Sequence, residues 1–262
     1  MKLTVHGCRG SIPISTPQSI IYGGNTSCYE LIFDDYQLIF DTGTGFRQVS
    51  IDVTKKTIIF YSHWHHDHIQ GLAFNSGLFN PKKNVYITCA LNDKNESKNI
   101  INRYFSGFYF PIELTKKLSN LKFVEFNDLK KDFEKDFQIE FLKLNHPGGS
   151  VGYSIKNQYK KITILLDNGY DKDQFFDLHK FADKSDYIVW DGMFTDKELK
   201  NKAFWGHSSI EQGIEFFQKT AIKNMLITHH DPARTDDQLK ILSKDLPQGI
   251  IFAKDGMIVD FT

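Results

Sequence analysis

The chain has 262 residues, and its 40% hydrophobic and 24% charged residues are typical of a globular protein that can bury a sizeable core. Basic and acidic residues number 32 each, and the basic ones are not gathered into a stripe. This argues against a large positively charged surface that binds long nucleic acids. Three cysteines without framework spacing, no signal-peptide pattern and no apolar run of transmembrane length favour a cytoplasmic protein with free thiols and no membrane partner.

Short apolar runs predict strands along most of the chain. These strands cover residues 2–7, 28–33, 36–43, 57–62, 121–126, 137–144, 151–156, 161–167, 185–191 and 225–228, and a terminal hairpin covers 249–261. Amphipathic patterns predict helices from about 92 towards 103 and over residues 173–182, 208–221 and 236–246. Strand-rich blocks followed by helices occur twice, which indicates an α/β fold of two packed sheets with outer helices, in one domain over residues 1–262.

The segment HWHHDH, from His63 to His68, follows the strand predicted over residues 57–62. In an extended segment, residues two apart point the same way, so His63 and His65 can share one metal ion. After the turn, Asp67 and His68 can face a second metal close by. Imidazole and carboxylate are the ligands expected for zinc, manganese or iron, and this density of them predicts a metal site.

Further candidate ligands stand at the ends of three other apolar strands. FLKLNHPGG ends in His146, ITILLDNG ends in Asp167, and MLITHHDP ends in His229 and His230. A carboxylate such as Asp167 can bridge two cations, with one oxygen on each. Taken singly, His146 is equally well explained as a loop histidine and Asp167 as a helix cap, but together with HWHHDH they fit one site with two metal ions.

HWHHDH is similar to the His-x-His-x-Asp-His signature of the metallo-β-lactamase superfamily, and the later candidate ligands follow in the order that this superfamily uses. The resemblance implies a four-layer αββα sandwich with two divalent metal ions, zinc first and manganese or iron as alternatives. It implies that one metal is held by His63, His65 and His146, the other by Asp67, His68 and His229, with Asp167 bridging. His229 is preferred to His230 because Ile227-Thr228-His229 matches the family pattern Leu-Thr-His.

A second segment, FWGHSSIEQG, resembles the His-Ser-Thr motif of ribonuclease Z and related phosphodiesterases. The resemblance implies that His207 is a general acid, that Asp191 on YIVWDGMF orients it, and that Asp67 belongs to the catalytic set. A helix-terminal histidine bonded to the backbone is the alternative for His207. Ser208 and Arg234 are candidate substrate contacts, although a surface salt bridge explains Arg234 equally well.

The glycine-rich segments 7–13 and 23–28 also resemble that branch, and their amides either approach a phosphate or form a structural turn. The aromatic run over residues 103–111 is best explained by core packing, ahead of nucleobase stacking or a homodimer interface.

One departure bears on the substrate: the long tRNA-gripping arm of ribonuclease Z is missing between His146 and Asp167, where only a hairpin fits. A small nucleotide-like phosphodiester, such as a cyclic nucleotide, is therefore the expected substrate. Two alternatives stay open, a ribonuclease that acts on RNA 3′ ends and a hydrolase of carboxylic esters, thioesters or lactams. A non-catalytic sensor is disfavoured by the complete ligand set.

Overall fold

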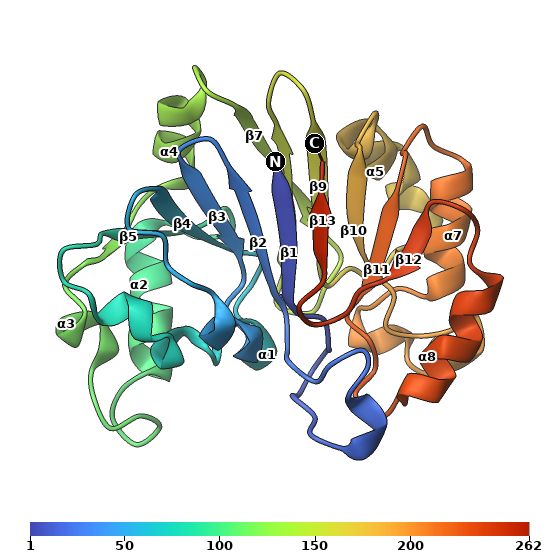
Figure 1. The fold of residues 1–262 in the computed structure, drawn as a ribbon, viewed down its shortest axis with the longest axis horizontal. Helices are drawn as coiled ribbons and strands as arrows, with labels where there is room; N and C mark the ends of the chain where they lie inside the picture. The colour runs from blue at the N-terminus through green and yellow to red at the C-terminus, as the bar shows by residue number, and fades with distance from the viewer. Residues whose placement is uncertain (262) are drawn as a thin grey trace.

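Two β-sheets lie face to face in the computed structural model, which describes residues 1–261 (Figure 1). Within these residues, one sheet has seven strands, in the order β13 (Ile258–Asp260), β1 (Lys2–Gly7), β2 (Cys28–Phe33), β3 (Tyr36–Phe40), β4 (Lys56–Tyr61), β5 (Val85–Cys89) and β6 (Leu121–Phe123). The described part of the other sheet has six, in the order β12 (Ile250–Phe252), β11 (Met225–Thr228), β10 (Tyr187–Asp191), β9 (Lys161–Leu165), β8 (Ser150–Lys156) and β7 (Gln138–Leu144).

The strand directions bring several chain segments to one edge of each sheet. Strands β3 to β6 run parallel to one another, as do β9 to β12, whereas β1, β2 and β3 pair antiparallel and so do β7, β8 and β9. The carboxyl ends of neighbouring parallel strands meet at one edge, which is where such sheets place their ligands. HWHHDH follows β4, Asp167 follows β9 and His229 follows β11 at such ends.

Apolar side chains fill three layers and produce the predicted αββα sandwich. The central layer lies between the sheets and includes Phe40 and Phe60, whose rings stack 5.5 Å apart, together with Tyr153 of the facing sheet. Burial of each such ring stabilises the fold by about 2–3 kcal/mol relative to exposure in water. The two outer layers lie between each sheet and its helices.

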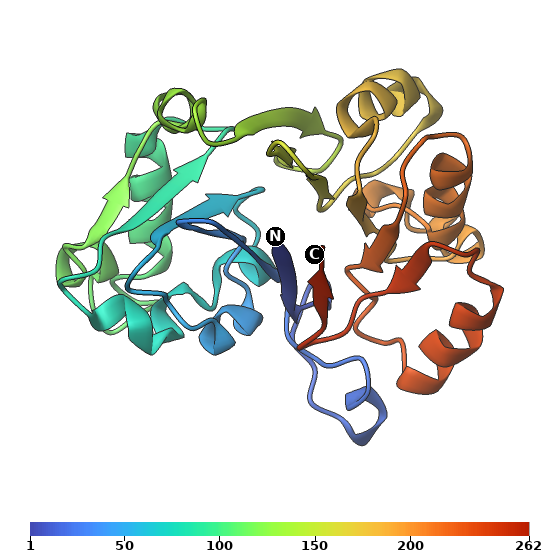
Figure 2. The same ribbon diagram turned by 45° about the horizontal axis from the view of Figure 1, so that its top comes forward.

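The helices cover the outer faces of the sheets, as Figure 1 and the turned view in Figure 2 both show. One outer face carries α1 (His66–Ile69), α2 (Lys94–Tyr104) and α3 (Leu114–Lys117), and the other carries α5 (Phe175–Ala182), α7 (Ile210–Gln218) and α8 (Asp236–Leu242). The short helix α6 (Asp196–Leu199) contacts α7. Helix α4 (Phe126–Phe133) packs with β7 against the central layer. Among the described residues, no helix has the length and apolar character needed to cross a membrane. The three cysteines are buried and free.

The predicted terminal hairpin is wrong, because its two strands belong to different sheets. β12 pairs parallel to β11, whereas β13 pairs antiparallel to β1 (Figure 2). The turn between them is tied to β1 by hydrogen bonds from the Gly256 amide to the Val5 carbonyl and from the Val5 amide to the Met257 carbonyl. The chain therefore crosses from one sheet to the other at the point where a hairpin would reverse.

The aromatic run over residues 103–111 belongs to the core only in part. Phe105 is 1% exposed and packs with the outer layer, as predicted. Phe108 and Tyr109 are 107% and 86% exposed, so core packing does not explain them. The pair Ser106-Gly107, a typical turn signal, separates the buried ring from the two exposed ones.

Candidate active site

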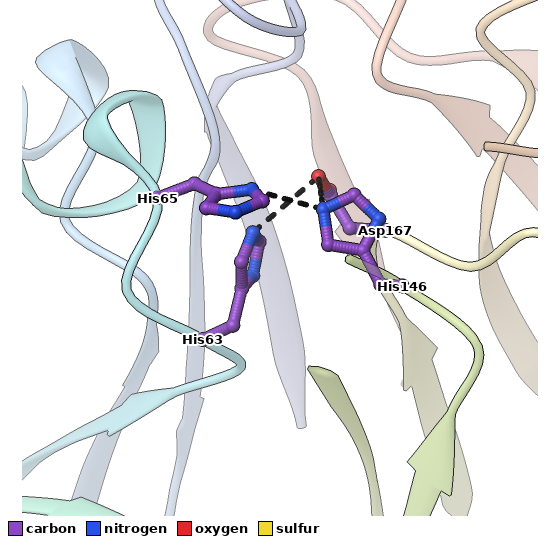
Figure 3. Close-up of side chains that lie close together, drawn as sticks. All are labelled: His63, His65, His146 and Asp167. Carbon is purple, nitrogen blue, oxygen red and sulfur yellow. Dashed lines mark hydrogen bonds and ion pairs between the residues drawn. The ribbon is translucent and has the colours of Figure 1, made fainter. Parts of the chain in front are cut away.

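Four side chains from three segments converge on one point at the edge of the sheets (Figure 3). His63 follows β4, His65 caps helix α1, His146 follows β7 and Asp167 follows β9. The Nδ1 atom of His65 lies 2.9 Å from Nε2 of His146. Asp167 Oδ2 lies 3.6 Å from Nε2 of His63 and 3.5 Å from Nε2 of His146. The sequence-predicted ligands of the first metal are thus brought together.

The second predicted set converges next to the first and shares Asp167 with it. His68 Nε2 lies 3.3 Å from Asp67 Oδ2 and 3.1 Å from Asp167 Oδ1. His229 Nδ1 lies 3.2 Å from Asp167 Oδ1, and its Nε2 lies 3.8 Å from Asp67 Oδ2. The ligand atoms of each set lie within 4.8 Å of one another. Each oxygen of Asp167 therefore faces a different set, which is the arrangement that a bridging carboxylate needs.

Several buried atoms in these sets lack any other partner, which tests whether a cation fits. Asp167 Oδ1 and the Nε2 atoms of His63, His68 and His229 are buried without a hydrogen bond. Buried polar atoms nearly always have a hydrogen-bond partner or a bound ion. A cation that accepts a lone pair from each of these atoms would serve as that partner. Zinc bonds of ~2.0–2.1 Å place tetrahedral ligand atoms about 3.4 Å apart, near the separations found here. The donor set of each group fits one divalent cation.

The protonation states of His63 and Asp167 agree with this fit. Burial, helped by the neighbouring His68, lowers the pKa of His63 well below its usual range, so the ring is neutral and can offer a lone pair. Burial alone would raise the pKa of Asp167, but attraction to His229, His68 and His63 outweighs it and holds the pKa well below its usual range. The carboxylate is therefore ionised at the centre of the site.

Neighbouring groups fix which nitrogen each histidine presents. His68 Nδ1 donates a hydrogen bond to Asp41 Oδ2 at 2.7 Å, and Asp41 also accepts from the amide and hydroxyl of Ser62 at 2.7 and 2.6 Å. His146 Nδ1 donates to the Gly206 carbonyl at 2.7 Å. In both rings the Nε2 lone pair is left for the site. Sequence reasoning missed Asp41, although it follows β3 as Asp167 follows β9, and that shared position was the available signal.

Close backbone approaches explain the glycines near the site. A Cβ on Gly10 would lie 2.4 Å from the His229 ring, so only glycine leaves room for this candidate ligand. The Gly10 amide donates to the His230 carbonyl, and the Ser11 amide donates to Asp67 Oδ2 at 2.7 Å. Of the two explanations for the segment 7–13, the structural turn accounts for these contacts, because both amides are already paired within the chain.

A histidine–aspartate pair lies directly beside the two sets. His207 Nδ1 donates to Asp191 Oδ2 at 2.8 Å, and Asp191, at the end of β10, also accepts from the amides of Asn168 and Met193. Burial alone would lower the pKa of His207, but Asp191 outweighs burial and raises the pKa to about 9. The His207 ring stands 4.8 Å from the His229 ring. Its partner is thus a buried carboxylate and not the helix backbone.

Two residues predicted as substrate contacts require correction. Ser208 is 0% exposed, because its hydroxyl donates to the Asn168 carbonyl and accepts from the Tyr170 amide. The Arg234 guanidinium is buried, and it donates to Glu198 Oε2 at 2.6 Å and to the Met193 carbonyl. Neither side chain lines the groove at the site. Both residues were predicted as contacts because they are close in sequence to His207 and His229. Their side chains instead hydrogen-bond to neighbouring segments of the chain.

The choice between the paired histidines is resolved by their ring contacts. His229 faces Asp67 and Asp167, whereas His230 points the other way and hydrogen-bonds through Nε2 to the Ala253 carbonyl at 3.0 Å. Burial lowers the pKa of His230 to about 3, which keeps the ring neutral in its apolar surroundings. His229 is therefore the histidine that the structure brings to the candidate centre.

A groove of about 470 Å³ opens over both sets of ligands. In addition to candidate ligands, it is lined by Ser11, His66, Pro147, Phe204, Trp205 and His207. Phe204 and Trp205 come from the 3-10 helix η6 (Ala203–Trp205), just before His207, and remain 77% and 45% exposed. Within the described chain, no lysine or arginine lines this groove. The arrangement therefore places two sets of candidate metal ligands, two aromatic rings and the His207–Asp191 pair around one groove.

Similarity to known proteins agrees with this geometry. Ribonuclease Z from Clostridium acetobutylicum is 23% identical over 91% of this chain and 90% of its own length. The metallo-β-lactamase fold protein YhfI from Bacillus subtilis superposes with a TM-score of 0.72 at 19% identity, covering 99% of both chains. A diphosphatase of the PhnP family superposes with a TM-score of 0.70 at 16% identity, covering 100% of this chain and 98% of its own. At these identities the two structures support the fold alone.

A sequence model of one protein family covers most of the chain and the candidate centre. The model, described as Beta-lactamase superfamily domain, matches residues 36–230, a range that includes HWHHDH, His146, Asp167 and His229. The chain therefore belongs to this superfamily, as the similarity of HWHHDH to the metallo-β-lactamase signature predicted.

Proposed function

We propose that this superfamily member is a dinuclear metal phosphodiesterase that hydrolyses a small nucleotide-like phosphodiester. The pairing of His207 with Asp191, beside two complete sets of metal ligands in one groove, is the observation that carries the proposal. Hydrolysis of thioesters would use the same ligands without needing such an acid, because a thiolate departs without a proton. Carboxylic esters and lactams, like alkyl phosphodiesters, release a group that needs one. The pair therefore favours a reaction whose leaving group requires a proton.

The ligand sets define which residues would hold the cations. His63, His65 and His146 would hold one, Asp67, His68 and His229 the other, and Asp167 would bridge them. Two divalent cations, zinc first and manganese or iron as alternatives, would lower the pKa of a shared water and neutralise charge on the phosphate oxygens. The Ser11 amide donates to Asp67 Oδ2 at 2.7 Å and helps to position this carboxylate.

His207 supplies the proton that an alkoxide leaving group needs. Its Nδ1–H is held by Asp191 at 2.8 Å, so the proton that can be donated is the one on Nε2. With a pKa of about 9, the ring carries this proton at neutral pH. Asp191 acts as a positioning residue, since it fixes the ring through Nδ1 and stabilises its protonated form. The exposed rings of Phe204 and Trp205 stand next to His207 and suit an organic leaving group.

The shape and charge of the site support a small substrate. The β8–β9 hairpin reverses through residues 157–160 and carries no arm. Among the described residues, no lysine or arginine lines the groove, so affinity for a polyanion has to come from the cations and the walls. A compact diester with a single phosphate suits this site better than a folded RNA.

Cleavage at RNA 3′ ends is the second candidate, and one observation favours it. The Clostridium acetobutylicum relative is named ribonuclease Z and aligns along 90% of its own length. The same metal ligands and the same acid would serve RNA cleavage. The two candidates differ in how a long substrate is held, and that difference is measurable.

The test of the acid uses two phosphodiesters that differ in their leaving group. His207→Ala should keep its metal content and lose roughly 10²–10⁴-fold in the cleavage of an alkyl phosphodiester. A nitrophenyl phosphodiester should be affected much less, because nitrophenolate departs without a proton. His179→Ala, which removes a histidine from α5, is the matched control and should cleave both diesters like the wild type. Equal losses on both diesters in His207→Ala would assign His207 a purely structural role.

A further inference from the structure

A second concave surface, which we name the aromatic cleft, lies next to the groove. It has a volume of about 770 Å³, and its walls include Trp64, His66, Arg103, Tyr104, Tyr109 and Phe110. This volume lies in the range of pockets that bind small molecules, whose walls are mainly apolar with few polar groups. The metal ligands and the acid account for the groove, but none of them uses this cleft.

The cleft and the groove share one lining residue, which belongs to HWHHDH. His66 lines both, and its neighbour Trp64 lines only the cleft. The residues on either side, His63, His65 and Asp67, face the candidate metal sets. Residues of this one short segment therefore line both cavities, and we expect a group attached to a phosphate in the groove to reach the cleft past His66.

The walls of the cleft suit a planar aromatic group. Trp64 is held by its indole nitrogen, which donates to Asn92 Oδ1 at 2.7 Å, and Tyr104 is held by a hydrogen bond between its hydroxyl and the His66 ring. Tyr109 is 86% exposed and has room to lie against a ligand. A planar ring with hydrogen-bonding edges, such as a nucleobase, stacks well on side chains of this kind.

One cation and one hydroxyl remain available for the polar edge of such a ring. Arg103 is exposed, and within residues 1–261 its guanidinium makes no ion pair or hydrogen bond. The hydroxyl of Tyr109 is likewise without a partner among the described residues. The cleft therefore combines aromatic faces with two free polar groups, which is the chemistry that recognises a base or another heteroaromatic ring.

We propose that the aromatic cleft is a substrate subsite that binds a nucleobase-like group attached to the phosphate in the groove. The inference rests on the proposed function, because the phosphodiester on the candidate metal centre is what places the ring. A second copy of the chain is the other occupant that such a surface could have. The lining residue shared with the groove and the concave shape favour the ligand, since interfaces between copies do not need to adjoin a catalytic groove.

The experiment compares two diesters with the same leaving group, thymidine 5′-(4-nitrophenyl) phosphate and methyl 4-nitrophenyl phosphate. The metal-loaded wild type should prefer the thymidine diester in kcat/KM. Tyr109→Ala should lower this preference by roughly 5- to 100-fold, mainly through KM, as expected for loss of one base–aromatic stacking contact. Phe108→Ala is the matched control, because Phe108 is adjacent and fully exposed but does not line the cleft, so the preference should stay unchanged.

The outcomes separate this inference from the proposed function. A wild type that cleaves both diesters without preference, or a Tyr109→Ala variant that keeps the preference, would overturn the subsite and leave the phosphodiesterase standing. If neither diester is cleaved, the proposed function fails. Calorimetric binding of thymidine 5′-monophosphate then decides the subsite without turnover, with weaker binding to Tyr109→Ala supporting it and equal binding refuting it. A wild-type dimer that Tyr109→Ala dissociates would assign the cleft to a second copy instead.

Discussion

Asp167 is the side chain that joins the two candidate metal positions. Oδ2 faces His63 and His146, whereas Oδ1 faces His68 and His229. The backbone at Asp167 has a φ of 45°, a left-handed conformation that few residues other than glycine, asparagine and aspartate adopt readily. Position 167 therefore requires a side chain with two charged oxygens and a residue that tolerates a left-handed backbone.

Asp167→Asn tests this bridging role without disturbing the backbone. Asparagine tolerates the same φ, but its amide offers one neutral oxygen in place of two charged ones. We expect the metal content to fall from about two ions per chain to one or fewer, measured by elemental analysis of protein purified without chelator. Asp173→Asn, an exposed aspartate in a helical turn, should keep the wild-type content. Unchanged metal in Asp167→Asn would show that the carboxylate does not bridge.

The candidate ligands could be predicted from the sequence because their signal is local. His63, His65, Asp67 and His68 crowd into one segment, and the remaining candidates each end an apolar strand. Asp41 carries no such local mark, because its role runs through the ring of His68. Ser208 and Arg234 show the opposite failure, since closeness in sequence says nothing about the direction in which a side chain points.

Helix α7 is the element that fixes the loop carrying His207. Its N-cap, Ser209, follows His207 by two residues, and Ser209 and Gln212 exchange hydrogen bonds of 2.9 Å in a capping box. The Ser209 hydroxyl also lies 2.5 Å from Asp196 Oδ1 at the start of α6. Ser209 is therefore hydrogen-bonded both to its own helix and to α6. These bonds hold the preceding loop, which includes His207, in place.

Ser209→Ala should loosen this loop as well as weaken the helix. Loss of the cap should lower the free energy of unfolding by ~1–2 kcal/mol, measured by denaturant titration. Cleavage of an alkyl phosphodiester should fall more than cleavage of a nitrophenyl phosphodiester, because the misplaced group is the acid. Thr235→Ala removes the same kind of capping box from α8 and should cost similar stability without changing the ratio of the two rates. An equal change of that ratio in both variants would argue against local positioning of His207.

The elements themselves were largely predictable, whereas their partners were not. The strands over residues 2–7, 28–33 and 225–228 lie where the apolar runs place them. β5 lies outside the predicted strands, although its Val-Tyr-Ile pattern is typical of a strand. The terminal segment shows the limit most clearly, because a strand, a glycine turn and a second strand fit both a hairpin and a crossover. Only the hydrogen bonds to β1 and β11 decide between them, and these partners are more than twenty residues away in sequence.

At the scale of the whole molecule, the candidate centre draws on both sheets. HWHHDH follows a strand of one sheet, and His146, Asp167 and His229 follow strands of the other. The central apolar layer contains side chains from both sheets, so neither can move away without exposing it. We propose on this ground that residues 1–262 form one domain, in which packing of the sheets sets the distance between the two halves of the site.

The same architecture bears on the size of the substrate. No arm extends from the β8–β9 hairpin, and the described lining of the groove contains candidate metal ligands and aromatic rings but no lysine or arginine. Binding of a long polyanion would depend on the release of many counterions by lysine and arginine side chains, and among the described residues none of these lines the groove. Small diesters should therefore be bound with little dependence on salt.

The most direct measurement is kcat/KM of the metal-loaded protein on cyclic nucleotides, dinucleotides and precursor tRNA, at low and high salt and after removal of metal by a chelator. The dinuclear phosphodiesterase predicts higher kcat/KM on a small diester than on precursor tRNA, weak dependence on salt, and loss of activity with the metal. Tight, strongly salt-dependent binding of precursor tRNA with cleavage at its 3′ end would contradict the assignment to a small substrate. Full activity in the metal-free protein would contradict the candidate centre itself.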